Sequence, residues 1–274
     1  AFGAPTRESN RRGLANEWRL DHDARMDYSR TLFTDKDQLK LSLFQTARRE
    51  RNDYETLTTP ILPAANPQLD LYRQNADRTN TEFQTDYELP LDGRTLKLGY
   101  DVEHNFNRYN YPGQTLDVVT GAVTPYSSAG NDFRYDQWIN AAYGSFQTQL
   151  GDFGLLAGLR VEQTDLETRQ SQGAAINKTD DLRLYPSLHV EREAGEGGKV
   201  SASYSVRTTR PEPEDLNPFV DRRDPRNLRA GNPLLKAKRT QSFEVGYEQD
   251  GKALTYHFTA YYRLHKNVVS DVTQ

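Results

Sequence analysis

The sequence predicts an all-β fold, an antiparallel up-and-down meander in which each strand pairs with the next along the chain. Three observations lead to this fold class. Apolar and polar residues alternate with a period of two through most of the 274 residues. Helical periodicity is not sustained anywhere. About ten alternating stretches are joined in turn by tight turns and by long polar segments.

The first hairpin begins at Trp18. Apolar residues alternate with charged ones from there to Phe33, the chain turns at residues 34–37 (TDKD), and alternation resumes through Leu39, Leu41 and Leu43. This outgoing stretch is longer than the usual five or six residues of globular strands. It is long enough to cross a bilayer, for which a tilted strand needs about 9–11 residues.

The second hairpin, residues 81–104, shows the alternation most clearly. One face carries Phe83, Tyr87, Leu96, Leu98 and Val102, and the other carries Glu82, Asp86, Lys97, Asp101 and Glu103. Between them lies the turn PLDG, in which an Asp-Gly pair favours a positive φ angle. A sheet with one face in water also alternates, so the pattern alone does not identify the environment.

Three more hairpins complete the predicted meander. The sequence predicts a strand over Asp136–Leu150, the turn GDFG and a return through Leu155 to Glu162. Leu184 to Val190 lead through AGEGGK to Val200 and Val206, and Phe243 to Tyr247 lead through QDGK to Leu254 and Tyr262.

The connections are asymmetric. Long polar loops are expected at Asn52–Asp77, Arg108–Arg134, Arg169–Asp181 and Pro211–Thr240, and in a meander they all lie at the end opposite the tight turns. Compact soluble domains seldom carry several such loops, whereas short turns at one rim and long loops at the other are typical of outer-membrane barrels. The sequence therefore predicts a segment of a transmembrane outer-membrane β-barrel. The apolar set of the second hairpin is expected in lipid and the charged set in a wet interior.

The composition fits this fold and excludes several classes of function. Only 35% of residues are hydrophobic, against roughly 45–50% in soluble domains, which suits a wall with a wet lumen. Net charge is −4, from 35 basic and 39 acidic residues, so no nucleic-acid partner is expected. Cysteine is absent, which excludes disulfides and thiolate metal sites. No apolar run is long enough for a membrane helix or a signal peptide.

One stretch, Tyr204–Glu248, resembles the barrel of TonB-dependent outer-membrane receptors. The matching segments are Arg210-Pro211, Leu216-Asn217-Pro218, Gly231-Asn232-Pro233-Leu234-Leu235 and Ser242–Tyr247, and a further match is LAGLRVEQT, residues 156–164. The resemblance implies a bacterial outer-membrane receptor that binds a scarce nutrient at its extracellular loops and imports it by TonB-coupled active uptake. Outer-membrane lipid and lipopolysaccharide are the other implied partners, and the type of nutrient is open.

The chain also departs from that family. The family has an N-terminal plug domain, a TonB-contacting box and 22 strands, whereas residues 1–274 are expected to form a partial barrel domain of about ten strands without a plug. The chain ends in SDVTQ, without the aromatic residue that usually closes such barrels. TonB contact is therefore expected only through a plug outside these residues. The first and last strands are expected not to pair with each other.

Candidate ligand-binding residues fall in two of the long loops. Arg222, Arg223, Arg226 and Arg229 form the first group, and Tyr109, Tyr111 and Tyr126, with Phe133, form the second. The arginine forks suit carboxylate or phosphate groups of a ligand or of lipopolysaccharide. The alternative is that they are solvated loop charges that pair with Asp221 and Asp224. The aromatic rings suit a sugar or an aromatic chelator, and packing within the loop explains them as well.

No catalytic or metal site is expected. The five histidines are scattered over different strands, and no pair of carboxylates stands out. We therefore expect no enzyme, no cofactor and no bound metal. Two alternatives to the receptor remain open at this point: a passive porin-like small barrel that closes by itself, and a soluble β-sandwich binding module.

Overall fold

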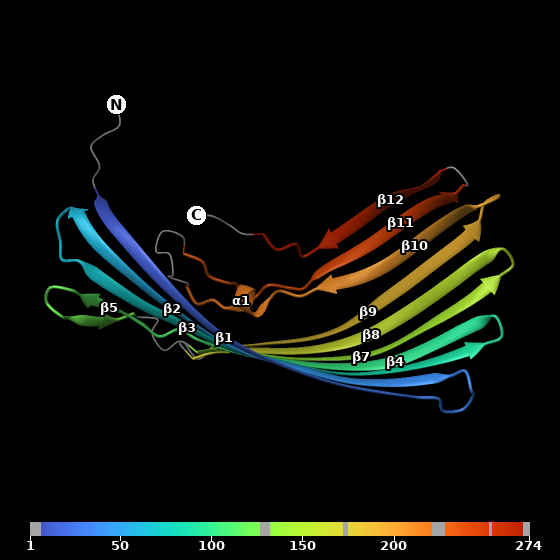
Figure 1. Cartoon of the computed structure of the whole chain (residues 1–274), viewed down its shortest axis with the longest axis horizontal. Helices are drawn as coiled ribbons and strands as arrows, with labels where there is room; N and C mark the ends of the chain where they lie inside the picture. The colour runs from blue at the N-terminus through green and yellow to red at the C-terminus, as the bar shows by residue number, and fades with distance from the viewer. Residues whose placement is uncertain (1–6, 127–131, 172–174, 221–227, 252–253, 271–274) are drawn as a thin grey trace.

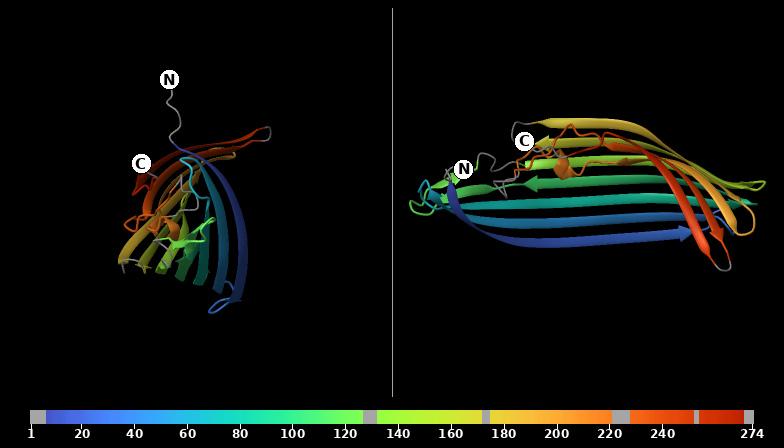
Figure 2. Two further views of the ribbon diagram at one scale, coloured as in Figure 1. Left: turned by 90° about the vertical axis from the view of Figure 1, so that its left-hand side faces the viewer. Right: turned by 90° about the horizontal axis from the view of Figure 1, so that it is seen from above.

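A computed structural model describes residues 7–126, 132–171, 175–220, 228–251 and 254–270. These residues form one antiparallel sheet of twelve strands. Ten of the strands follow one another in chain order, and two short ones lie off this path: β5 pairs with β3, and β6 pairs with β5. The sheet is curved like a trough, with one concave and one convex face (Figures 1 and 2). The predicted all-β antiparallel meander is confirmed.

The strands are long, and several have more than twenty residues. They are β1 (Glu8–Arg30), β2 (Gln38–Leu62), β3 (Gln68–Leu91), β4 (Arg94–Asn110), β5 (Gly113–Asp117), β6 (Val123–Pro125), β7 (Asp132–Leu150), β8 (Phe153–Gln170), β9 (Ile176–Glu193), β10 (Gly198–Thr209), β11 (Lys238–Asp250) and β12 (Thr255–Lys266). A short helix, α1 (Pro213–Leu216), lies between β10 and β11.

The tight turns share one rim of the trough, at the right of Figure 1. The turns at residues 34–37, 91–94, 151–152 and 194–197 each join two neighbouring strands there. Part of the fifth turn, at residue 252, lies outside the described residues, but the N–H of Asp250 donates to the carbonyl of Gly197 over 2.7 Å. Gly93 and Gly151 have φ angles of 65° and 60°, which favour glycine. The predicted common rim is confirmed for the turns that the structure describes.

The expectation of long structureless loops at the other end is wrong where the strands continue into these segments. β2 and β3 occupy nearly all of Asn52–Asp77 and leave a connection of residues 63–67. In Arg108–Arg134 the strands β4, β5, β6 and β7 take up most residues, and in Arg169–Asp181 β9 already begins at Ile176. The segment Pro211–Thr240 contains α1 and the start of β11.

The longer strands have a simple physical cause. Alternation marks a strand only while one of its faces is apolar. Arg48 to Asp53 in β2 are polar or charged on both faces, and so are Arg73 to Asp77 in β3 apart from Ala76, yet their backbones pair in continuous register. A strand of 25 residues such as β2 greatly exceeds the 9–11 residues that cross a bilayer. The extra length therefore lies in water, where no alternation is required.

The predicted faces of the second hairpin are confirmed. Phe83 pairs with Val102 and Tyr87 pairs with Leu98, so these side chains share one face. Phe83 and Leu98 are exposed on that face. Glu82 and Glu103 oppose each other on the other face. The helix α1 lies over this second face, which is the concave one (Figure 1).

The sheet is open. β1 pairs only with β2 and β12 only with β11 within the described part of the chain, as expected from the sequence. No second sheet faces the first one among these residues, so the β-sandwich alternative is wrong. The small closed barrel is likewise not what these strands form, because its first and last strands would have to pair.

The turn after β1 depends on one carboxylate. Asp37 accepts hydrogen bonds from the N–H groups of Leu32 (2.9 Å) and Phe33 (2.8 Å) and from the hydroxyl of Tyr87 (2.9 Å). Burial raises the pKa of Asp37, but these hydrogen bonds outweigh burial and hold the pKa below its usual range. A lowered pKa in the folded state stabilises the turn above the ordinary aspartate pKa of about 3.9, and this stabilisation is lost as pH falls through the folded pKa.

We therefore expect hydrogen-exchange protection of the Phe33 amide, relative to a β1 amide in the same sample, to fall in acid. The variant Asp37→Asn, which lacks the charge, should show weaker protection at neutral pH and no comparable step. If the protection of the Phe33 amide relative to the β1 amide were the same in both proteins at every pH, this role for Asp37 would be contradicted.

Candidate functional site

The segment between β10 and β11 crosses the concave face of the sheet. Residues 210–219, here called the strap, leave the end of β10 and fold back toward β3 and β4 (Figure 1). Pro213 begins α1, where proline needs no hydrogen-bond partner for its nitrogen. The N–H of Glu212 donates to Asp215 Oδ2 over 3.3 Å. The side chains of Leu216 and Phe219 are buried against the sheet.

An aromatic cluster holds the strap. The cluster consists of Tyr72, Ala76, Tyr109, Tyr111, Phe133 and Tyr135 from the sheet region and Leu216 and Phe219 from the strap. The rings of Tyr111 and Phe219 stack with centroids 4.4 Å apart and planes inclined by 10°. Such ring pairs contribute about 0.5–1.5 kcal/mol beyond the area they bury. A cluster of buried apolar residues thus lies between the strap and the concave face.

Glu214 connects the strap to two strands. Its Oε1 accepts from Nη2 of Arg78 over 2.7 Å and from the hydroxyl of Tyr109 over 3.0 Å. Burial, followed by the negative charge of Glu214, raises the pKa of Tyr109. The phenol therefore stays protonated and donates. Arg78 lies in β3 and Tyr109 in β4, so this one carboxylate ties α1 to both strands.

The two Asn-Pro segments noted in the sequence lie side by side. The N–H of Gly231 donates to the carbonyl of Asn217 over 2.8 Å, and the N–H of Asn232 donates to that of Asp215 over 2.7 Å. The Asn217 side chain donates to the Tyr111 hydroxyl (2.9 Å) and accepts from the Phe219 N–H (3.1 Å). The two motifs therefore form one local structure that fixes the strap on the aromatic cluster.

The first residue of the strap is also anchored. Arg210 pairs with Glu162 of β8 and donates to Thr164 Oγ1 over 3.0 Å. Glu162 also accepts from Arg160 over 3.1 Å and from the Tyr185 hydroxyl over 3.2 Å. This buried carboxylate thus gathers partners from β8, β9 and the strap.

A polar groove lies between the strap and strands β1 to β7. It has a volume of about 650 Å³. Ion pairs run across its floor: Arg48 lies 2.7 Å from Asp21 and 3.8 Å from Glu50, and Arg78 lies 3.5 Å from Glu50. Its other lining side chains include Asn80, Asn105, Asn107, Tyr135, Gln137 and Glu212. Guanidinium and amide groups in this arrangement can hold a ligand with several oxygen atoms.

The predicted arginine group is only partly placed. Arg222, Arg223 and Arg226 lie outside the described residues, as do Asp221 and Asp224. Arg229 is mostly exposed and lies 3.4 Å from Asp215 Oδ1 beside the strap. Pairing with a nearby aspartate, the alternative considered from the sequence, therefore occurs at this residue.

The predicted aromatic group packs within the protein. Tyr109 is 0% exposed, Phe133 is 1% exposed and Tyr111 is 6% exposed. Tyr126 is half-buried against the same cluster. Tyr109 and Phe133 belong to β4 and β7 and not to a loop. Packing accounts for their positions, and a role of these rings in ligand binding stays a prediction.

The sequence did not reveal Arg78 and Glu214 as site residues. Arg78 stands in a stretch of β3 that is polar on both faces, and Glu214 stands in the run PEPED, residues 211–215. The local signal was limited to this run of three acidic residues and two prolines directly after Arg210. The described helix is too short and too polar to cross a membrane. The described residues contain no cluster of three or more His, Asp or Glu placed to hold a metal ion.

Comparison with known proteins agrees with this geometry. The profile of the Outer membrane protein beta-barrel family matches residues 30–274. A comparison with curated proteins gives no match. Solved structures share the fold at low sequence identity. The copper transporter OprC is 13% identical with a TM-score of 0.57, over 84% of this chain and 40% of OprC.

Two receptors of Acinetobacter baumannii are also similar. The ferric preacinetobactin receptor BauA is 11% identical with a TM-score of 0.54, over 91% of this chain and 37% of BauA. The siderophore receptor PiuA is 11% identical with a TM-score of 0.50, over 90% of this chain and 49% of PiuA. The chain thus spans less than half the length of each of these three proteins.

Proposed function

The chain belongs to the outer membrane protein beta-barrel family, and on this premise we propose that it forms part of a receptor that binds a scarce nutrient at its extracellular end for active uptake. The resemblance to TonB-dependent receptors, the barrel-wall fold and the location in the bacterial outer membrane are confirmed by the family and by the shared folds. The similar structures are transporters and receptors, not enzymes.

The strap over the polar groove supports this function best. The tight-turn rim corresponds to the periplasmic side of outer-membrane barrels, so the strap and groove lie toward the cell exterior. A ligand arriving from outside would meet the guanidinium groups of Arg48 and Arg78 beneath α1. Arg78 would exchange its contact with Glu214 for oxygen atoms of the ligand, and the strap would move as the ligand binds.

Other parts of the proposal extend beyond the described geometry. Residues 1–274 form a partial barrel domain in it, and the TonB complex acts through a plug that the concave face would enclose. Arg222, Arg223, Arg226 and Arg229 provide additional contacts for an anionic ligand at the outer end. Tyr109, Tyr111 and Tyr126 act through the packing of the strap. Outer-membrane lipid and lipopolysaccharide surround the wall.

Binding by the full-length protein in detergent tests the first half of the proposal. We expect at least one of ferric citrate, a ferric hydroxamate, a ferric catecholate, cobalamin and copper(II) to bind, as measured by isothermal titration calorimetry. Arg78→Gln should weaken that binding roughly tenfold or more, because hydrogen bonds to charged groups contribute about 1.5–3 kcal/mol. Lys97→Gln, on the same face near the opposite rim, should leave it unchanged.

Uptake by cells tests the second half. Uptake of the bound compound should stop when a protonophore collapses the proton gradient. Uptake that continues at the same rate would instead support passive diffusion through the full-length protein. If Arg78→Gln bound the compound as tightly as the parent protein, the groove would be excluded as the ligand site.

A further inference from the structure

On the convex face, the side chains change from apolar to charged over a short distance along the strands. On this face β1 carries Tyr28, Met26 and Leu20, and β4 carries Leu98, Val102 and Phe106. At the outer end of this apolar stretch, one cross-strand row reads Leu20, Arg49, Asp77, Arg108, Arg134 and Arg169, from β1 to β8. Every member after Leu20 is charged. The apolar side belongs in the bilayer, so this row begins at the level of the lipid headgroups.

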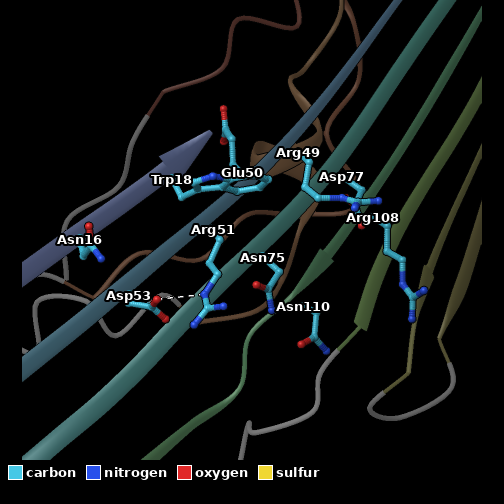
Figure 3. Close-up of a pocket in the computed structure, with 10 residues that line it drawn as sticks. All are labelled: Asn16, Trp18, Arg49, Glu50, Arg51, Asp53, Asn75, Asp77, Arg108 and Asn110. Atoms are coloured by element: carbon cyan, nitrogen blue, oxygen red, sulfur yellow. Dashed lines mark hydrogen bonds and ion pairs between the residues drawn. The ribbon is translucent and has the colours of Figure 1, made fainter. Parts of the chain in front are cut away.

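A shallow groove opens on this face at the same level (Figure 3). The outer groove, as we call it, has a volume of about 720 Å³. Its outward-facing side chains are Asn16, Trp18, Arg49, Arg51, Asp53, Asn75, Asp77, Arg108 and Asn110. Glu50 also borders it, but the Glu50 carboxylate bonds Arg78 on the other face. The groove is thus separate from the polar groove under the strap.

Among the described side chains that line the outer groove and face outward, three arginines (Arg49, Arg51 and Arg108) meet two aspartates (Asp53 and Asp77). Asp77 forms an ion pair with Arg49 (2.8 Å). Asp53 pairs with Arg51 (3.0 Å) and with Arg73. Asp132 pairs with Arg108 (2.8 Å) and with Arg134 (3.8 Å). Among the described side chains, five arginines therefore share these three aspartates. Asp136, one row toward the membrane, is bonded to His104 over 3.0 Å.

This arrangement leaves capacity for an anion. Arg108 and Arg134 stand directly opposite each other on adjacent strands, an unfavourable placement for like charges. A guanidinium has five N–H donors, and each aspartate engages only one or two of them. The side chains of Arg49, Arg51 and Arg108 are 70%, 47% and 48% exposed. Two oxygen atoms of a phosphate group can accept two parallel N–H hydrogen bonds from one guanidinium group.

The remaining groups suit a sugar. Trp18 stands directly opposite Arg51 on the neighbouring strand, one row outward from Leu20 and Arg49, and presents its indole to the groove. Aromatic residues are common at this level of a membrane protein, at the bilayer interface. The carboxamides of Asn16, Asn75 and Asn110 offer both donors and acceptors to hydroxyl groups. A ligand held here has its polar part in the groove and its acyl chains along the apolar strands below.

From this placement we infer that the outer groove binds the phosphorylated sugar headgroup of a lipid in the outer leaflet. The guanidinium groups of Arg49, Arg51 and Arg108 hold phosphate, the three asparagines contact hydroxyl groups, and Trp18 packs on the sugar ring. The site faces lipid and serves to seat the wall in the outer leaflet, so it does not depend on the nutrient site.

Native mass spectrometry of the full-length protein tests this site. The probes are bisphosphorylated lipid A and its dephosphorylated form. The triple variant Arg49→Gln/Arg51→Gln/Arg108→Gln should retain the phosphorylated lipid at least about tenfold more weakly, given the attraction of basic side chains to anionic lipid surfaces. Retention of the dephosphorylated lipid should not change. The control Arg25→Gln/Arg207→Gln/Arg263→Gln removes the same charge from the concave face and should retain both lipids normally.

The outcomes separate cleanly. Unchanged retention in the first variant, equal losses in both triple variants, or an equal loss of the dephosphorylated lipid would each overturn the inference. If the glutamine variant does not assemble, Arg49→Lys/Arg51→Lys/Arg108→Lys keeps the charge but removes the forks. Retention of phosphorylated lipid should then fall by a smaller factor, and full retention would overturn the role of the guanidinium groups.

Discussion

Replacing Phe258 by arginine is expected to block assembly of the wall, whereas the same change one residue later should be tolerated. Phe258 lies on the convex face of β12 opposite Tyr247, and Thr259 lies on the concave face opposite Gly246. Arginine on the lipid face of a barrel costs roughly 2–4 kcal/mol at the bilayer midplane. Arginine on the other face would stay in the wet interior.

The fraction of full-length protein in the outer membrane with heat-modifiable mobility on gels measures this effect. Leu98→Arg in β4 repeats the test in another part of the sheet, because Leu98 shares the convex face with Tyr87. Both lipid-face variants should lose most of the assembled form, and Thr259→Arg should keep it. Equal assembly of Phe258→Arg and Thr259→Arg would show that the two faces do not differ in environment.

The sequence predicted these two faces because a membrane-spanning strand must keep charged side chains off its lipid face. Each outward residue of β4 from Leu96 to Phe106 is apolar, histidine or tyrosine, while Lys97, Asp101 and Glu103 point inward. A shift of register by one residue would place every one of these charges in lipid. The alternation can therefore be recognised without any knowledge of the fold, and the turns PLDG, GDFG and QDGK are predicted by their Asp-Gly and Gly-Asp pairs.

The same rule explains what sequence did not predict. Above the headgroups both faces of a strand are in water, so Arg48 to Asp53 carry no pattern that separates strand from loop. Only the pairing of β2 with β3 keeps them extended. The prediction of long loops assumed that each strand ends where its alternation of apolar and polar residues ends. In this protein the end of the alternation marks the upper edge of the membrane instead.

The candidate site was hidden for a different reason. Glu214 meets Arg78 from 136 positions away in sequence. Neither residue stands in a periodic segment, and a contact between them depends on how the strap crosses the sheet. The Asn-Pro motifs did point to the correct part of the chain. Their role, to bond one end of the strap to the other, became clear only from the hydrogen bonds of Gly231 and Asn232.

Gly231→Ala is expected to detach the strap from the aromatic cluster. A Cβ atom at this position would lie 2.4 Å from the carbonyl oxygen of Asp215 and 2.7 Å from that of Asn217. Both are backbone atoms of the strap, so no side chain can turn aside to make room. The substitution therefore breaks the hydrogen bonds from Gly231 and Asn232, and overpacking of this kind costs about 1–3 kcal/mol.

Limited proteolysis of the full-length protein in detergent measures the detachment, with mass spectrometry to locate cuts in residues 210–220. We expect rapid cleavage there in Gly231→Ala and slow cleavage in the parent protein. Gly13→Ala is a matched control, because a Cβ on Gly13 of β1 would come no closer than 3.8 Å to any neighbour. Heat-modifiable mobility should be normal in both variants, since β1 to β12 pair without the strap. Equal protection of the strap in Gly231→Ala and Gly13→Ala would mean that the two Asn-Pro segments do not hold it, and that the aromatic contacts of Leu216 and Phe219 are sufficient by themselves.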